Sequence, residues 1–146
     1  MQPGDEDRDT VTLLFDPRSE DPAAPVLVGI GIGPLTAPGA IRFAIPSSGR
    51  EVTIPMQDQI RIGRADAQRD TQPELDLTED STHEAVISRL HAVVLNTAQG
   101  VAILDLSSVN GTQVNGYRLP PHLPYALNNG DELKFGDLIV HVFFEE

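Results

Sequence analysis

Short apolar segments recur along this chain at intervals of about eight to twelve residues, and turn residues separate them. Ile41, Phe43 and Ile45 alternate with less apolar residues before a turn at 46–49. Similar segments follow at 52–54, 60–62, 92–96, 101–104, 133–135 and 138–144. Such alternation indicates strands, and no long stretch has the period of a helix. The sequence therefore predicts an all-β sandwich.

Residues 1–39 differ in composition from the rest of the chain. They are rich in acidic residues and proline, which is typical of segments that do not build a core of their own. Two stretches within them, Thr10–Phe15 and Val26–Ile32, have the composition of strands. We therefore expect an acidic leader over 1–39, either flexible or adding an edge strand, and one domain over 40–146.

Charge and composition exclude several classes of protein. The net charge is −12, with 22 acidic residues against 10 basic ones, whereas binding of duplex nucleic acid depends on clustered Lys and Arg. No apolar run approaches the roughly 20 residues of a membrane-spanning helix. The acidic N-terminus has no apolar core of the kind found in secretory signals, and the chain has no cysteine. We expect a cytoplasmic protein without direct membrane insertion.

Five short motifs occur in a fixed order after the leader. They are Ile62–Arg64, Ser88–Ala92, Asn110–Thr112, Val114–Gly116 and Asn129–Gly136. In this order and spacing they resemble the forkhead-associated (FHA) domain, over roughly residues 40–146. The resemblance implies a sandwich of two packed, mostly antiparallel sheets with recognition loops at one end. It also implies a module without a cofactor that binds phosphothreonine peptides.

Arginine and serine side chains in these motifs are suited to binding a phosphate. Arg64 follows the end of a predicted strand, where binding residues gather, and its guanidinium can donate two parallel hydrogen bonds to phosphate. Ser88 and Arg89 place a hydroxyl and a second guanidinium side by side. The resemblance implies that Arg64 and Ser88 contact the phosphate directly. Arg89 adds either a second phosphate contact or a contact to a peptide carbonyl.

Asn110 precedes a glycine, and Asn-Gly is a strong turn signal. Its amide both donates and accepts, so the resemblance implies that it clamps the peptide main chain. Val109 departs from members of the family that carry a polar donor there, which removes one potential phosphate contact. Four residues are expected to support the site rather than bind the peptide: Gly63, His91, Gly111 and Thr112.

Two other kinds of function compete with a phosphopeptide reader. A degenerate FHA-like sandwich would serve as a phosphate-independent interaction or assembly domain, and Val109 favours this alternative. Ser88, His91 and Asp105 are the residue types of a nucleophilic triad, but no nucleophile-elbow motif surrounds Ser88. The four histidines lack the close spacing of zinc motifs. We therefore expect neither an enzyme nor a metal site.

Two further expectations concern charge and regulation. The connection 65–87 holds seven acidic residues, so we expect it to disfavour partners with acids beside the phosphothreonine. The expected partner is a phosphothreonine-containing protein or a Ser/Thr kinase. Thr10, beside several acids, is a candidate phosphorylation site through which the leader would occupy its own binding site.

Overall fold

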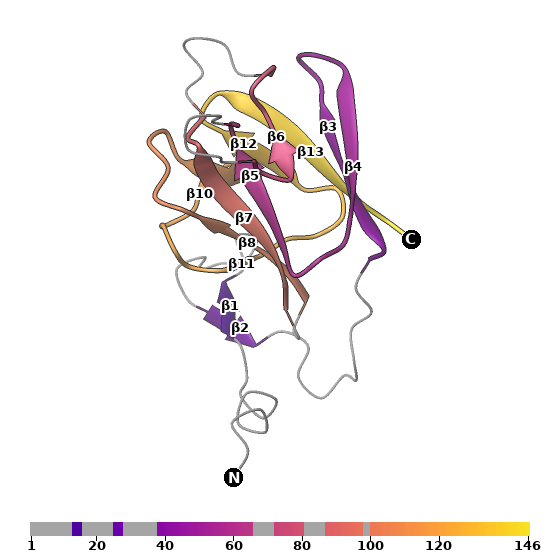
Figure 1. The fold of residues 1–146 in the computed structure, drawn as a ribbon. Helices are drawn as coiled ribbons and strands as arrows, with labels where there is room; N and C mark the ends of the chain where they lie inside the picture. Colours follow the sequence, from indigo (N-terminus) through magenta and orange to yellow (C-terminus); the bar gives the residue numbers. More distant parts are fainter. Residues whose placement is uncertain (1–12, 16–24, 28–37, 66–71, 81–86, 98–99) are drawn as a thin grey trace.

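The computed structural model describes residues 13–15, 25–27, 38–65, 72–80, 87–97 and 100–146. These residues form strands joined by turns and loops, and two sheets pack as layers (Figure 1). The first sheet runs in the order β2 (Pro25–Leu27), β1 (Leu13–Phe15), β11 (Tyr125–Ala126), β8 (Gly100–Asp105), β7 (Leu90–Thr97), β5 (Gln59–Gly63), β6 (Leu75–Asp76).

The second sheet has six strands. Its order is β10 (Tyr117–Arg118), β9 (Thr112–Val114), β12 (Glu132–Phe135), β13 (Leu138–Glu145), β3 (Ala40–Ile45), β4 (Arg50–Pro55). Among the strand pairs of the described residues, β1 with β11 and β5 with β6 are parallel, and the others are antiparallel. The predicted sandwich of two mostly antiparallel sheets is therefore confirmed.

Alternating side chains from both sheets fill the space between the layers. In β3 the residues Ile41, Phe43 and Ile45 are buried and their neighbours are not, because successive side chains of a strand point to opposite faces. The facing layer contributes Ile60 and Ile62 from β5. The period-two pattern in the sequence thus identified the side chains of the core.

The turn predicted at 46–49 joins β3 to β4, and Gly49 within it has a φ of 75°. Asn115 and Gly116 both have positive φ, of 50° and 89°, in the tight turn between β9 and β10. The connection after β5 contains the short strand β6, which pairs in parallel with β5. In the leader, β1 and β2 pair with each other, and β1 pairs with β11. The division of the chain at residues 39 and 40 stays a prediction, and Thr10 lies outside the described residues.

No helix long and apolar enough to span a membrane occurs in the part of the chain that the structure describes.

Candidate functional site

Three connections of the first sheet meet at one end of the sandwich. Because β5 and β8 are both antiparallel to β7, their last residues lie beside the start of β7. Gly63 pairs with Leu90, and Ala92 pairs with Asp105. The segments that follow β5, precede β7 and follow β8 are therefore neighbours, and they carry the residues expected to bind a peptide.

Gly63 lets the first two of these segments approach each other. The register of β5 against β7 shifts between Ile62 and Gly63, which brings the backbone of Ser88 and Arg89 close. A Cβ atom at position 63 would lie 2.0 Å from the carbonyl oxygen of Arg89 and 2.9 Å from that of Ser88. Only glycine fits this approach without a shift of the backbone.

Arg64 is half-buried and bonded to the segment before β7 through both its backbone and its side chain. Its backbone N–H donates to the carbonyl of Arg89 at 3.2 Å. Its Nε–H donates to the carbonyl of the buried Ile87. No other described residue accepts a side-chain hydrogen bond from Arg64, so the N–H groups on its two Nη atoms can serve an incoming oxyanion.

Ser88 links the segment before β7 to the loop after β8. Its Oγ accepts a hydrogen bond from the backbone N–H of Val109 at 3.1 Å. Accepting this bond leaves the hydroxyl hydrogen of Ser88 available as a donor, and no acceptor for it lies among the described residues. The hydroxyl is thus held at the junction of the two loops, with its proton available to a phosphate oxygen.

His91 braces the same two loops from inside the sandwich. The ring is fully buried, its Nδ1 accepts from the backbone N–H of Ser88 at 3.1 Å, and its Nε2 lies 2.9 Å from the carbonyl of Gly111. This pattern requires the neutral tautomer with the proton on Nε2. Burial lowers the pKa of His91, against the opposing effects of the Gly111 carbonyl and Asp105.

Asp105 organises the loop between β8 and β9. Its buried carboxylate accepts hydrogen bonds from the hydroxyls of Ser108 at 2.6 Å and Thr112 at 2.7 Å. Ser108 Oγ in turn accepts from the backbone N–H of Gly111 at 3.0 Å. Sequence reasoning assigned Asp105 no supporting role, although an acid followed by hydroxyl residues at the end of a strand is a known signal for such a loop.

These contacts do not form a nucleophilic triad. Both ring nitrogens of His91 are engaged by backbone groups, so neither can act as a base for the Ser88 hydroxyl. The Asp105 carboxylate bonds to Ser108 and Thr112 rather than orienting the imidazole. No group of three or more potential metal ligands occurs in the described ranges.

Arg89, Val109 and Asn110 are exposed at the tips of the loops. Val109 is 75% exposed, so its side chain makes little contribution to the core. Ser108 cannot take over the polar role missing at Val109, since its hydroxyl both donates and accepts within the loop. Ser107 is bonded to the ring of His122 at 2.8 Å.

Gly111 adopts a φ of 89° and packs against Arg118 of β10. A Cβ atom at position 111 would lie 2.8 Å from the guanidinium carbon of Arg118. The hairpin of β9 and β10 brings this cation next to the Asn110 loop. Sequence reasoning missed Arg118, because no local signal shows that the hairpin folds back onto this loop.

A family comparison agrees with this architecture. The family model of the FHA domain matches residues 60–136, which is just over half of the chain. The chain belongs to the FHA domain family. This family consists of binding modules, and the matched region contains every residue of the site described above.

Individual relatives of this FHA domain are distant. It is 32% identical over 107 residues to the E3 ubiquitin-protein ligase rnf8 of Danio rerio, which covers 62% of this chain and 22% of the ligase. The chain thus spans about a fifth of the length of the ligase.

Solved structures include an FHA domain of an Arabidopsis thaliana protein, at 25% identity and a TM-score of 0.61, covering 78% of this chain and 92% of that one. A second is Mycobacterium tuberculosis EmbR in complex with a low-affinity phosphopeptide, at 25% identity and a TM-score of 0.56, covering 73% of this chain and 25% of that one.

Proposed function

We propose that this FHA domain binds phosphothreonine peptides and acts as a non-catalytic adaptor in cytoplasmic Ser/Thr kinase signalling. The observation that carries the proposal is the junction at Ser88, whose Oγ accepts the Val109 N–H while its own proton stays available. Arg64 lies beside this junction, because it donates hydrogen bonds to the carbonyls of Ile87 and Arg89.

Each expected residue has a distinct role in this proposal. The Nη groups of Arg64 and the hydroxyl of Ser88 donate to the phosphate, and charge-assisted bonds of this kind are about twice as strong as neutral ones. Asn110 holds the peptide main chain from the loop after β8. Arg89 is exposed beside Ser88 and supplies a second cation, either to the phosphate or to a peptide carbonyl.

We expect threonine to be preferred over serine as the phosphorylated residue. The additional methyl group of threonine gains about 0.8 kcal/mol when it is buried, which is roughly a fourfold preference. A preference much larger than this would require a shaped pocket for the methyl group as well as simple transfer from water.

The acidic connection is proposed to select against acids beside the phosphothreonine. Of its described acids, Asp80 is buried in an ion pair with Arg50, and Asp76 accepts hydrogen bonds from its own turn. Glu79 is exposed. Selectivity is therefore best tested with Glu79→Gln, because neutralising Asp76 or Asp80 would alter the fold of the connection as well as its charge.

A phosphate-independent interaction domain is the second candidate. The exposed Val109 beside Ser88 favours it, since a polar side chain there would add a phosphate contact. The two candidates differ in one measurable property, which is whether removal of the phosphate group from the partner abolishes binding.

Fluorescence anisotropy against an oriented phosphothreonine peptide library tests the proposal, with phosphoserine and unphosphorylated pools alongside. We expect micromolar binding that requires the phosphate and is lost in Arg64→Gln. Arg42→Gln is the matched control, because it also removes one cation but from a pair with Glu145 on β13. Folded protein that binds no phosphorylated pool, or binds phosphorylated and unphosphorylated pools equally, would contradict the proposal.

A further inference from the structure

A turn at residues 76–80, which we call the Asp76 turn, holds the backbone on both sides of Arg64. Before Arg64, the carbonyl of Gly63 accepts from the N–H of Leu77 at 2.8 Å. After it, the N–H of Ala65 donates to Asp76 Oδ1 at 3.3 Å and to Thr78 Oγ1 at 3.0 Å. The residue proposed to bind the phosphate is therefore bracketed by contacts to this turn.

Asp76 itself is fixed by donors within the turn. Its Oδ1 accepts from the N–H of Thr78 at 2.9 Å and from the hydroxyl of the same residue. Burial acts to raise the pKa of Asp76, but the hydrogen bonds from Thr78 and Ala65 outweigh it and lower the pKa. The carboxylate is thus charged at neutral pH and accepts these bonds as an anion.

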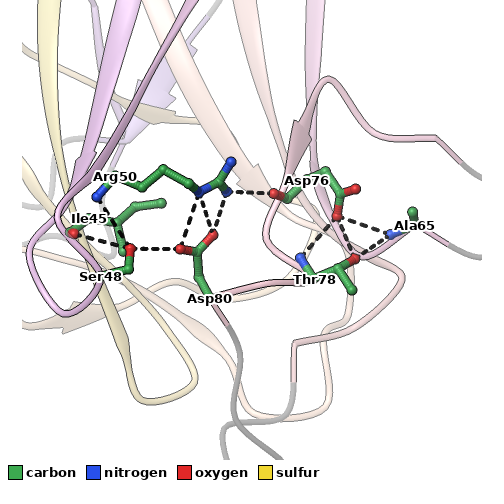
Figure 2. Close-up of polar contacts among 7 residues, drawn as sticks. All are labelled: Ile45, Ser48, Arg50, Ala65, Asp76, Thr78 and Asp80. Atoms are coloured by element: carbon green, nitrogen blue, oxygen red, sulfur yellow. Dashed lines mark hydrogen bonds and ion pairs between the residues drawn. The ribbon is translucent and has the colours of Figure 1, made fainter.

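An ion pair anchors the Asp76 turn to the other sheet (Figure 2). The guanidinium of Arg50, at the start of β4, pairs with Asp80, whose side chain is only 1% exposed. Arg50 Nη2 also donates to the backbone carbonyl of Asp76 at 2.8 Å. Ser48, in the turn between β3 and β4, donates its hydroxyl to Asp80 at 2.8 Å.

We propose that Asp76, held in place by Arg50 and Asp80, is a positioning residue that sets where Arg64 presents its guanidinium. The proposal rests on the proposed function, in which Arg64 binds the phosphate. Arg64 lies beyond the last residue of β5, so contacts outside the regular pairing of the sheet fix its backbone. One set comes from Arg89 and Ile87, and the Asp76 turn supplies the other.

The physical reason is the length of the arginine side chain. A small rotation of the backbone at Ala65 or Arg64 displaces a guanidinium several bonds away, and a bidentate contact to phosphate tolerates little displacement. A buried ion pair is well suited to such a role, since loss of one partner leaves an uncompensated charge and forces the turn to move.

Variants of Asp76 and Arg50 test the proposal by phosphopeptide anisotropy. Asp76→Ala and Arg50→Gln should each weaken binding about tenfold, the equivalent of one or two lost hydrogen bonds. Asp76→Asn keeps the Oδ1 acceptor and should restore affinity to within roughly threefold of the original protein. Arg42→Gln also removes one arginine from an ion pair, but that pair with Glu145 is partly exposed and lies within the second sheet, so affinity should be unchanged.

Double variants separate positioning from general loss of stability. The effect of Asp76→Ala should largely disappear when Arg64→Lys is already present, and should be additive with Asn110→Ala. The proposal would be overturned if the effect of Asp76→Ala were additive with both Arg64→Lys and Asn110→Ala. It would also be overturned if Asp76→Ala bound the phosphopeptide as tightly as the original protein.

A measurement without peptide distinguishes this outcome from failure of the proposed function. The Nε–H resonance of Arg64 reports its hydrogen bond to the Ile87 carbonyl. It should shift and exchange faster with solvent in Asp76→Ala but not in Arg42→Gln. If the peptide affinity of the original protein does not depend on the phosphate group, the proposed function is wrong. If phosphate binding is present but neither the resonance nor the affinity changes, only the positioning role is wrong.

Discussion

Gly63 lies so close to Arg89 that a Cβ atom at position 63 would be 2.0 Å from the Arg89 carbonyl oxygen. This approach joins the end of β5 to the segment that carries Ser88. The centre of the candidate site therefore requires a residue without a side chain at position 63, rather than a particular chemical group there. The position of the residues proposed to bind phosphate therefore depends on Gly63, which is not itself proposed to contact the ligand.

The substitution Gly63→Ala should destabilise the domain and displace this segment. We expect the free energy of unfolding in urea to fall by about 2–4 kcal/mol, because the backbone must shift to admit the methyl group. Phosphopeptide affinity should fall as well. Gly49→Asn is the control, since Gly49 has a φ of 75° that asparagine tolerates and no atom within 4 Å of an added Cβ. An unchanged stability of Gly63→Ala would contradict the described approach.

The substitution Thr112→Val should cost about 1–3 kcal/mol of unfolding free energy. Thr112 is fully buried and donates its hydroxyl to Asp105, and the valine leaves the buried carboxylate with one donor fewer. Thr53→Val, at an exposed position of β4, should change the stability little. Equal effects of the two substitutions, measured by urea denaturation, would show that the Asp105 network does not hold the loop.

Acid should destabilise the domain through His91. Its pKa is lowered in the folded state, so below about pH 6.5, the ordinary value, the unfolded chain binds the proton more readily. Stability contributed by neutral His91 is therefore fully present above that pH and declines as the pH falls toward the lowered pKa. The slope is at most about 1.4 kcal/mol per pH unit for one proton.

Urea midpoints between pH 8 and pH 5 measure this dependence. Protonation would place a hydrogen on Nδ1 opposite the N–H of Ser88, so phosphopeptide affinity should fall over the same range. The pH dependence of the urea midpoint should persist in His122→Gln and should shrink in a folded His91→Gln variant. A slope that is the same with and without His91 would assign the effect to other groups.

The substitution Val109→Thr should strengthen phosphopeptide binding about threefold to tenfold. Threonine has nearly the same shape as valine and adds a hydroxyl beside the Ser88 junction, where it can donate to phosphate. Because Val109 is 75% exposed, the midpoint of thermal unfolding should not change. Affinity for an unphosphorylated peptide should stay the same. A gain for both peptides would indicate an apolar or nonspecific contact instead.

Much of the fold could be predicted because its signals are local. Ile41, Phe43 and Ile45 form a period-two pattern that identifies a strand and its buried face. Asn115 and Gly116 are the residue types that a tight turn with positive φ demands. Short-range preferences of this kind depend on the backbone and the next few residues, so they can be seen without the rest of the molecule.

Supporting contacts of the site were harder to predict, because they join segments far apart in sequence. Asp105 and Arg118 received no role from sequence reasoning, although the first anchors the loop after β8 and the second packs against Gly111. The predicted roles of Arg64, Ser88, Arg89 and Asn110 in ligand binding stay predictions.

The sequence by itself determined the class of fold, the strand faces and the order of the motifs, since these follow from residue type and spacing. Only the tertiary structure decided the state of the acids in the connection after β5. In the sequence, Asp80 is one of several acids in a polar connection, which predicts a solvated charge. In the structure it is buried, because it forms an ion pair with Arg50 of the other sheet, 30 residues away in the sequence. Burial of a charge depends on a partner that desolvates with it, and only packing of the two sheets brings that partner into place.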